Sequence, residues 1–259
     1  MKPLDIEATT DFVNRNISRF HQDRVRLLEK MDLSTLLKKK NPYLFRAKNI
    51  TTPTELINDL LVSVLSSSEE GLFGRFLEDL AIFIATQTCD AHKSTAPGVD
   101  FEFTHQDVYY VVSVKSGTNW GNSSQQKLQE HDLRDAVKRL KQSRLTGNIQ
   151  PVLGICYGKT RTTFLRGYMK VVGQNFWYFI SEDPQLYQRI VAPLGDEARQ
   201  YNDTFLANRN LVVERFAGEL AEKYSTASGE IDWAKLIELN SGNLNPGTAT
   251  EPEPDPSGE

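Results

Sequence analysis

The stretch that most restricts the fold is residues 98–117, GVDFEFTHQDVYYVVSVKSG. It contains two runs rich in aromatic and β-branched residues, with polar residues between them. Two such runs in close succession predict two strands paired as a hairpin. The second run ends on Lys115 and passes into a loop of Gly, Asn and Ser. The sequence therefore predicts a β-sheet in which Lys115 lies at the end of a strand.

Helical patterns surround this hairpin on both sides. Apolar residues recur at helical spacing, and capping residues and prolines mark the ends of segments. This order predicts the α/β (α+β) class: a central mixed β-sheet flanked by helices, with helical N- and C-terminal additions. The predicted helices are 9–31, 32–40 (ended by Asn41-Pro42), one opening at Pro53, 66–88, 124–145 (capped by Ser123-Ser124), 184–192 and 196–224. The other predicted strands are 149–158 and a hairpin over 167–180 around Gly173-Gln174.

Size and composition point to an ordinary globular protein. The chain has 259 residues, 39% hydrophobic and 25% charged, which is enough to bury a sizeable core. We expect a helical N-terminal region at 1–65, a core with C-terminal helices at 66–240, and a disordered acidic tail at 241–259. No apolar run approaches the roughly 18 residues of a membrane span, and the N-terminus lacks the features of a signal peptide, so a cytoplasmic location is expected. Cys89 and Cys156 lie far apart and are expected to be small core residues.

Charge is distributed unevenly along the chain. The net charge is -4, yet residues 101–180 hold 11 Lys and Arg against 5 Asp and Glu, while residues 181–259 hold 6 against 15. The basic middle is compatible with a surface for a polyanion, and equally with a chance imbalance on solvated faces.

Alternation along the two predicted strands brings a carboxylate near a lysine. Asp100 and Glu102 share one face of the first strand, and Ser113 and Lys115 share one face of the second. In a hairpin, Asp100 and Lys115 then lie at the same end. A carboxylate can hold Mg²⁺, and an ammonium can steady a hydroxide or a phosphate charge, so this pairing favours metal-assisted phosphodiester hydrolysis.

A third acid stands on the helix before the hairpin. Glu78 belongs to a stripe with Gly71, Gly74, Ala81 and Ala85, which recur at steps of three and four residues. These small residues would let another backbone approach the carboxylate closely. Most helix glutamates face solvent, and this alternative stays open.

These residues resemble the motif of the PD-(D/E)xK nuclease superfamily, which includes most type II restriction endonucleases. The resemblance rests on Pro97-Gly98-Val99-Asp100, then Ser113-Val114-Lys115 after twelve residues, with Glu78 on the preceding helix. It covers residues 70–160. It implies a restriction-endonuclease-like fold, metal ligation by Asp100 with the Val114 carbonyl, and Lys115 positioning or deprotonating water.

The sequence departs from the family at Ser113, where the usual motif has Asp or Glu. Certain restriction enzymes with Ser-x-Lys supply the missing carboxylate from the next helix. Glu130 lies fifteen residues after Lys115 on such a predicted helix, near Leu133 and Val137. The second metal-binding acid is therefore Glu130 or Glu78. The alternative for Glu130 is an exposed ion pair with Arg134.

The loop after Lys115 and the basic residues beyond it are candidates for DNA contact. Small polar side chains suit phosphate contacts and base readout, and lysines and arginines neutralise phosphates. An ordinary polar loop with a core-anchoring tryptophan is the alternative. The DNA-binding candidates are Ser116, Asn119, Trp120, Asn122, Lys127, Lys159 and Arg161, with Arg166 and Lys170 as further basic candidates.

A second glycine-rich segment, GICYGKT at 154–160, has the wrong spacing for a phosphate-binding P-loop and precedes a β-like segment. The resemblance implies a type II restriction endonuclease that cuts double-stranded DNA with Mg²⁺, leaving 5'-phosphate ends. It also implies a homodimer, with the helical region 1–65 used for DNA binding or dimerisation, and a cognate DNA methyltransferase as genetic partner. A structure-specific repair nuclease and a catalytically silent DNA-binding module are the alternatives.

Overall fold

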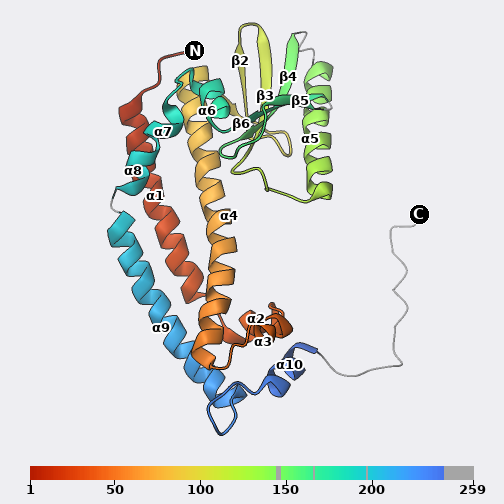
Figure 1. Cartoon of the computed structure of the whole chain (residues 1–259). Coiled ribbons are helices and arrows are strands. Elements are labelled where there is room, and N and C mark those ends of the chain that lie inside the picture. The colour runs from red at the N-terminus through yellow and green to blue at the C-terminus, as the bar shows by residue number, and fades with distance from the viewer. Residues whose placement is uncertain (144–146, 166, 197, 242–259) are drawn as a thin grey trace, which may run out of the picture. The chain divides into compact units, whose positions relative to one another are not determined.

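Six strands form one mixed sheet in the order β1-β2-β3-β4-β6-β5. The protein is described by a computed structural model that covers residues 1–143, 147–165, 167–196 and 198–241 (Figure 1). The expected α/β class, with a mixed sheet flanked by helices, is confirmed. The strands are β1 (His92–Lys93), β2 (Phe101–His105), β3 (Val108–Lys115), β4 (Asn148–Ile155), β5 (Thr163–Leu165) and β6 (Tyr168–Val172).

The predicted hairpin is present as β2 and β3. The two strands are antiparallel, with Phe101 opposite Val112 and His105 opposite Val108. Gln106 and Asp107 connect them with φ of 48° and 60°. Positive φ at both central residues is the conformation that matches the twist of a two-residue hairpin. β3 then pairs in parallel with β4, and β4 with β6, so the carboxyl ends of these three strands lie at one edge.

Helices cover both faces of this sheet. The part of helix α4 (Pro53–Cys89) from Phe73 onward packs on one face, and helix α5 (Ser123–Gln142) covers the other (Figure 1). Side chains alternate between the two cores: Val112 and Val114 face α4, whereas Val111 packs against Leu133 of α5. The helices are α1 (Ile6–Glu29), α2 (Leu33–Lys38), α3 (Pro42–Ala47), α4 (Pro53–Cys89), α5 (Ser123–Gln142), α6 (Gln174–Ser181), α7 (Leu186–Arg189), α8 (Val191–Gly195), α9 (Ala198–Tyr224) and α10 (Trp233–Ser241).

The chain divides into two compact units, and each is described separately. The first consists of Met1–Lys30 and Val64–Arg209 and contains the whole sheet. The second consists of Met31–Ser63 and the described residues from Asn210 onward. The boundaries expected at 65/66 and 240/241 stay predictions; the chain passes between the two units after Lys30, within α4 and within α9. Of the tail expected to be disordered, residues 242–259 lie outside the described residues.

Several predicted elements differ from the observed ones. Serines 66–68 do not start a new helix, because α4 continues through them from Pro53. Pro42 does end one helix, but it also begins α3, where Asn41 accepts the Tyr43 N–H as its cap. The segment after Gly173 is the helix α6, not a strand of a hairpin. The cap of α5 is Asn122, in place of Ser123-Ser124.

Candidate active site

Asp100 is fixed just before β2 by bonds to β3. Its N–H donates to the Val112 carbonyl at 2.9 Å. Its Oδ2 accepts the Val114 N–H at 2.6 Å and lies 3.5 Å from the Ser113 hydroxyl. The carboxylate is therefore held against the end of β3 by one strong backbone bond, and Oδ1 has no protein donor among the described residues.

Lys115 is the last residue of β3, and its backbone hydrogen bond shows in which direction the preceding Val114 carbonyl points. The Lys115 carbonyl accepts the Cys156 N–H of the chain after β4 at 2.9 Å. Successive carbonyls of a strand point to opposite neighbours. The Val114 carbonyl therefore points to the side on which Asp100 lies. The Lys115 ammonium stands over the Trp120 ring, with Nζ 5.6 Å from its centroid.

Glu78 reaches the same edge from α4. Ala81 and Ala85 of its stripe are fully buried against the sheet. At Gly74 a Cβ would lie 3.3 Å from the Ser116 hydroxyl, so glycine there gives the chain after β3 close access to the helix. The small residues thus let α4 approach the end of β3 closely, as the sequence predicted. Glu78 is half-buried and stands among these small residues on the helix.

Electrostatics show that the three charged groups act on one another. Burial and the Asp100 charge raise the pKa of Glu78 to about 7, and Lys115 opposes this rise. Burial raises the pKa of Asp100, while the Val114 N–H and Lys115 work to lower it. Burial and the charges of Glu78 and Asp100 also raise the pKa of the Cys156 thiol. Burial and the neighbouring Asp100 charge therefore both disfavour the ionised form of Glu78.

Ser113 is completely buried, and its hydroxyl is directed at Asp100. Within the described part of the chain, no group of three or more His, Cys, Asp or Glu side chains is arranged to hold a metal ion. The edge therefore offers two carboxylates, Glu78 and Asp100, with the Val114 carbonyl.

Glu130 lies on α5 and stays a predicted second acid. Its carboxylate pairs with Arg134 at 2.7 Å, the i,i+4 ion pair that was the alternative, with its own side chain 17% exposed. As expected from the sequence it lies near Leu133 and Val137, but these line a hollow with Ile149 of β4. The preceding residue, Gln129, donates its side-chain N–H to the Gly98 carbonyl at 2.8 Å, so this part of α5 lies beside the chain that leads to Asp100. The Glu130 charge is not among the causes that shift the pKa of Glu78 or Asp100.

Two loops leave the same edge and interlock. Residues 116–122 follow β3, and residues 156–162 follow β4. The Tyr157 N–H donates to the Ser116 carbonyl at 2.9 Å. The Tyr157 ring occupies the space where a Cβ on Gly117 would be, at 2.5 Å, and Thr118 fills the corresponding space beside Gly158, also at 2.5 Å. The two loops therefore form one packed surface.

The predicted DNA contacts fall into two groups. Trp120 packs against Leu153, Ile155 and Val172, and the Asn122 carbonyl oxygen accepts N–H groups of α5, so both have structural roles. Ser116 is half-buried, and Lys170 is half-buried on β6. Arg166 lies outside the described residues. The exposed candidates are Asn119, Asn122, Lys127, Lys159 and Arg161.

Two basic residues beside the site were not identified from the sequence. Arg75 precedes Glu78 by one helical turn and lies close enough for its charge to lower the pKa of that carboxyl. Lys93 stands on β1 opposite Phe101, next to Asp100, and likewise lowers the pKa of Asp100. The i,i+3 spacing could have indicated Arg75. The two-residue strand β1 left no pattern from which Lys93 could be found.

The sheet, the preceding helix and the spacing of Glu78, Asp100 and Lys115 define a restriction-endonuclease-like nuclease of the PD-(D/E)xK type. The family model described as type II restriction endonuclease EcoO109I matches residues 7–202, and the chain belongs to this family of DNA nucleases. No curated protein matches the chain. Within the described residues, no helix combines the length and the apolar character needed to cross a membrane.

Proposed function

We propose that the chain is a type II restriction endonuclease that cuts double-stranded DNA at a specific sequence by Mg²⁺-dependent hydrolysis, leaving 5'-phosphate and 3'-hydroxyl ends. The observation that carries the proposal is the meeting of Glu78, Asp100 and Lys115 at the carboxyl edge of β3. Membership in the family supports DNA as the substrate. In this role the protein acts in the cytoplasm.

The residues at the edge suit a magnesium ion. Mg²⁺ prefers hard oxygen ligands and is commonly held by one or two carboxylates together with waters and substrate phosphates. Glu78, Asp100 and the Val114 carbonyl would hold it. The Asp100 charge contributes to the raised pKa of Glu78, and a bound cation would oppose this effect. A bound ion would supply Lewis-acid catalysis and would make a water molecule more acidic.

Lys115 supplies the positive charge that accompanies these carboxylates. Its ammonium holds the attacking water and stabilises the charge that develops on the phosphate oxygens. The Trp120 ring beneath it limits the positions that the ammonium can take. Ser113 has the role of a positioning residue, because its hydroxyl is directed at Asp100.

DNA would lie across the two interlocked loops. Lys159 and Arg161 are placed to neutralise phosphates, and Asn119 is exposed for hydrogen bonding to base edges. A homodimer would match the symmetry of a palindromic site. A DNA methyltransferase of the same specificity would protect the host DNA.

A second candidate is a DNA-binding module without cleavage activity. Ser113 favours it, because the position that carries an acid in the usual motif holds a buried hydroxyl. A repair nuclease that acts on DNA structure is the third possibility, and the same assay separates all three.

The test is incubation with plasmid DNA and Mg²⁺. Discrete fragments support restriction, a smear supports a repair nuclease, and binding without cutting supports the silent module. Asp100→Asn and Lys115→Met should each abolish cutting. The matched controls are Asp107→Asn in the β2–β3 turn and Lys138→Met, whose side chain pairs with Asp135 on α5. Cutting by both site variants at the wild-type rate would remove the assignment.

A further inference from the structure

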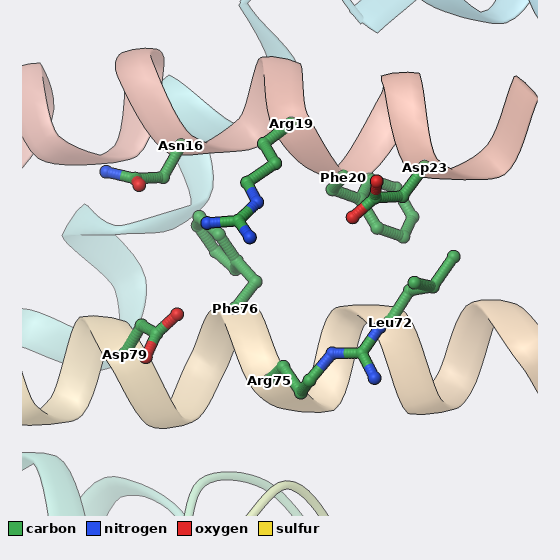
Figure 2. Close-up of a pocket in the computed structure, with 8 residues that line it drawn as sticks. All are labelled: Asn16, Arg19, Phe20, Asp23, Leu72, Arg75, Phe76 and Asp79. Atoms are coloured by element: carbon green, nitrogen blue, oxygen red, sulfur yellow. The ribbon is translucent and has the colours of Figure 1, made fainter. Parts of the chain in front are cut away.

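The cation Arg75 stands beside the carboxylate pair on α4. It precedes Glu78 by three residues, so the two side chains leave neighbouring positions on the helix surface. Its side chain is exposed, and it lines a groove between α1 and α4 together with Arg19 and Asp79. Figure 2 shows its guanidinium in this groove near Leu72, clear of Asp79. Arg75 thus projects from the helix that carries Glu78 without being used by the protein itself.

The cation Lys93 stands on the other side of the pair. β1 pairs with β2 so that Lys93 is opposite Phe101, and the next residue, Ser94, donates its N–H to the Asp100 carbonyl at 3.1 Å. The backbone ladder thus fixes Lys93 within one residue of Asp100. Its side chain is exposed at the outer edge of the sheet.

In the parts of the chain that the structure describes, each cation acts on a carboxylate only through its charge, and neither forms a salt bridge or a hydrogen bond. No carboxylate lies within 4.0 Å of the Arg75 guanidinium or the Lys93 ammonium there, and neither side chain donates a hydrogen bond. Nearby cations with other environments do form pairs, such as Arg26 with Asp23 at 3.1 Å. An exposed cation beside two acids, held by neither of them, can bind an anion that approaches those acids.

We propose that Arg75 and Lys93 bind the DNA phosphates on either side of the one that reacts. The inference rests on the proposed function, because it takes the reacting phosphate to lie at Glu78 and Asp100. The two cations would fix the position of the backbone over the site without reading its sequence. Lys115 would then act on the central phosphate, with Arg75 on the α4 side and Lys93 on the β1 side.

The experiment measures how duplex binding depends on salt. A fluorescent duplex that carries the mapped cleavage site is titrated with protein in Ca²⁺ between about 50 and 200 mM salt. Log affinity falls with log salt, and each phosphate contact contributes about 0.9 to the steepness of this fall. Arg75→Gln and Lys93→Gln should therefore each make the slope shallower by about 0.9, and the double variant by about 1.8. Arg75→Lys and Lys93→Arg should restore it. The controls Arg26→Gln and Lys138→Gln remove the same charge from ion-paired residues and should leave the slope unchanged.

Two failures are distinguishable. Wild-type protein that neither binds nor cuts DNA would overturn the proposed function. Wild-type protein that binds and cuts, with a double variant that keeps the full slope, would overturn this inference alone. Circular dichroism on each variant confirms that a lost contact is not lost folding.

Discussion

The clearest prediction concerns Glu78, whose replacement should abolish cleavage and yet stabilise the metal-free protein. Burial and the neighbouring Asp100 raise the pKa of Glu78 from 4.5 to about 7. The folded state therefore favours the protonated acid more than the unfolded state does. The stability that this gives is present below pH 4.5 and is lost as the pH rises through about 7. At pH 8 the folded wild-type protein must carry an unfavourable charge, which Glu78→Gln removes.

The magnitude follows from the pKa change. At about 1.4 kcal/mol for each pH unit, a rise of about 2.5 units corresponds to at most about 3.4 kcal/mol. The side chain is only half-buried, so screening by solvent reduces this to about 1–2 kcal/mol. For a protein of this size the variant should melt about 3–6 °C higher than wild type at pH 8.

The assay is thermal unfolding followed by circular dichroism in EDTA at pH 5 and pH 8. The gap between Glu78→Gln and wild type should be large at pH 8 and should nearly close at pH 5. Glu70→Gln, an exposed change on the same helix, should show no such dependence on pH. A Glu78→Gln protein that is less stable than wild type at pH 8, or a gap equal at both pH values, would refute the reasoning.

Three further predictions concern other residues. Lys115→Met should reduce the cleavage rate at least about 100-fold while duplex binding in Ca²⁺ falls by much less, because the ammonium acts on the developing charge; equal losses in both assays would contradict this. Glu130→Gln should cut plasmid within about threefold of wild type, because the Glu130 charge does not contribute to the shifted pKa of Glu78 or Asp100; loss of cutting would place Glu130 in the site. Gly154→Ala should destabilise by about 3 kcal/mol in urea unfolding, because its Cβ would lie 2.1 Å from the Phe176 ring; an unchanged midpoint would show that Phe176 moves freely.

The parts of the fold that the sequence predicted are those in which local pattern and tertiary packing agree. The hairpin follows from two β-prone runs around Gln106-Asp107, and β4 follows from an apolar run of strand length. The stripe around Glu78 predicted the packing of this helix for the same reason. Small residues at helical spacing allow another part of the chain to approach the helix closely. Both cysteines are buried and free, as expected.

The predicted elements that were wrong are those in which a local sequence pattern is compatible with two different structures. Serines can cap a helix or continue it, and only packing decides that α4 runs through 66–68. The aromatic residues after Gly173 favour strands, yet Phe176 and Trp177 are buried by helix α6 against the sheet. The choice between Glu78 and Glu130 as the second acid stays a prediction, because both lie on helices that pack near Asp100.

The packing between the two loops has a consequence for attempts to change what the protein recognises. Because the Tyr157 ring fills the space above Gly117, and Thr118 fills the space beside Gly158, neither loop can be redesigned while the other is kept. A library that randomises residues 116–122 alone would mostly yield proteins whose second loop no longer fits. In the proposed function these loops contact DNA, so new specificity would have to be selected from paired changes in both loops. Gly117 and Gly158 would be kept, because a Cβ at either position would clash with the opposite loop.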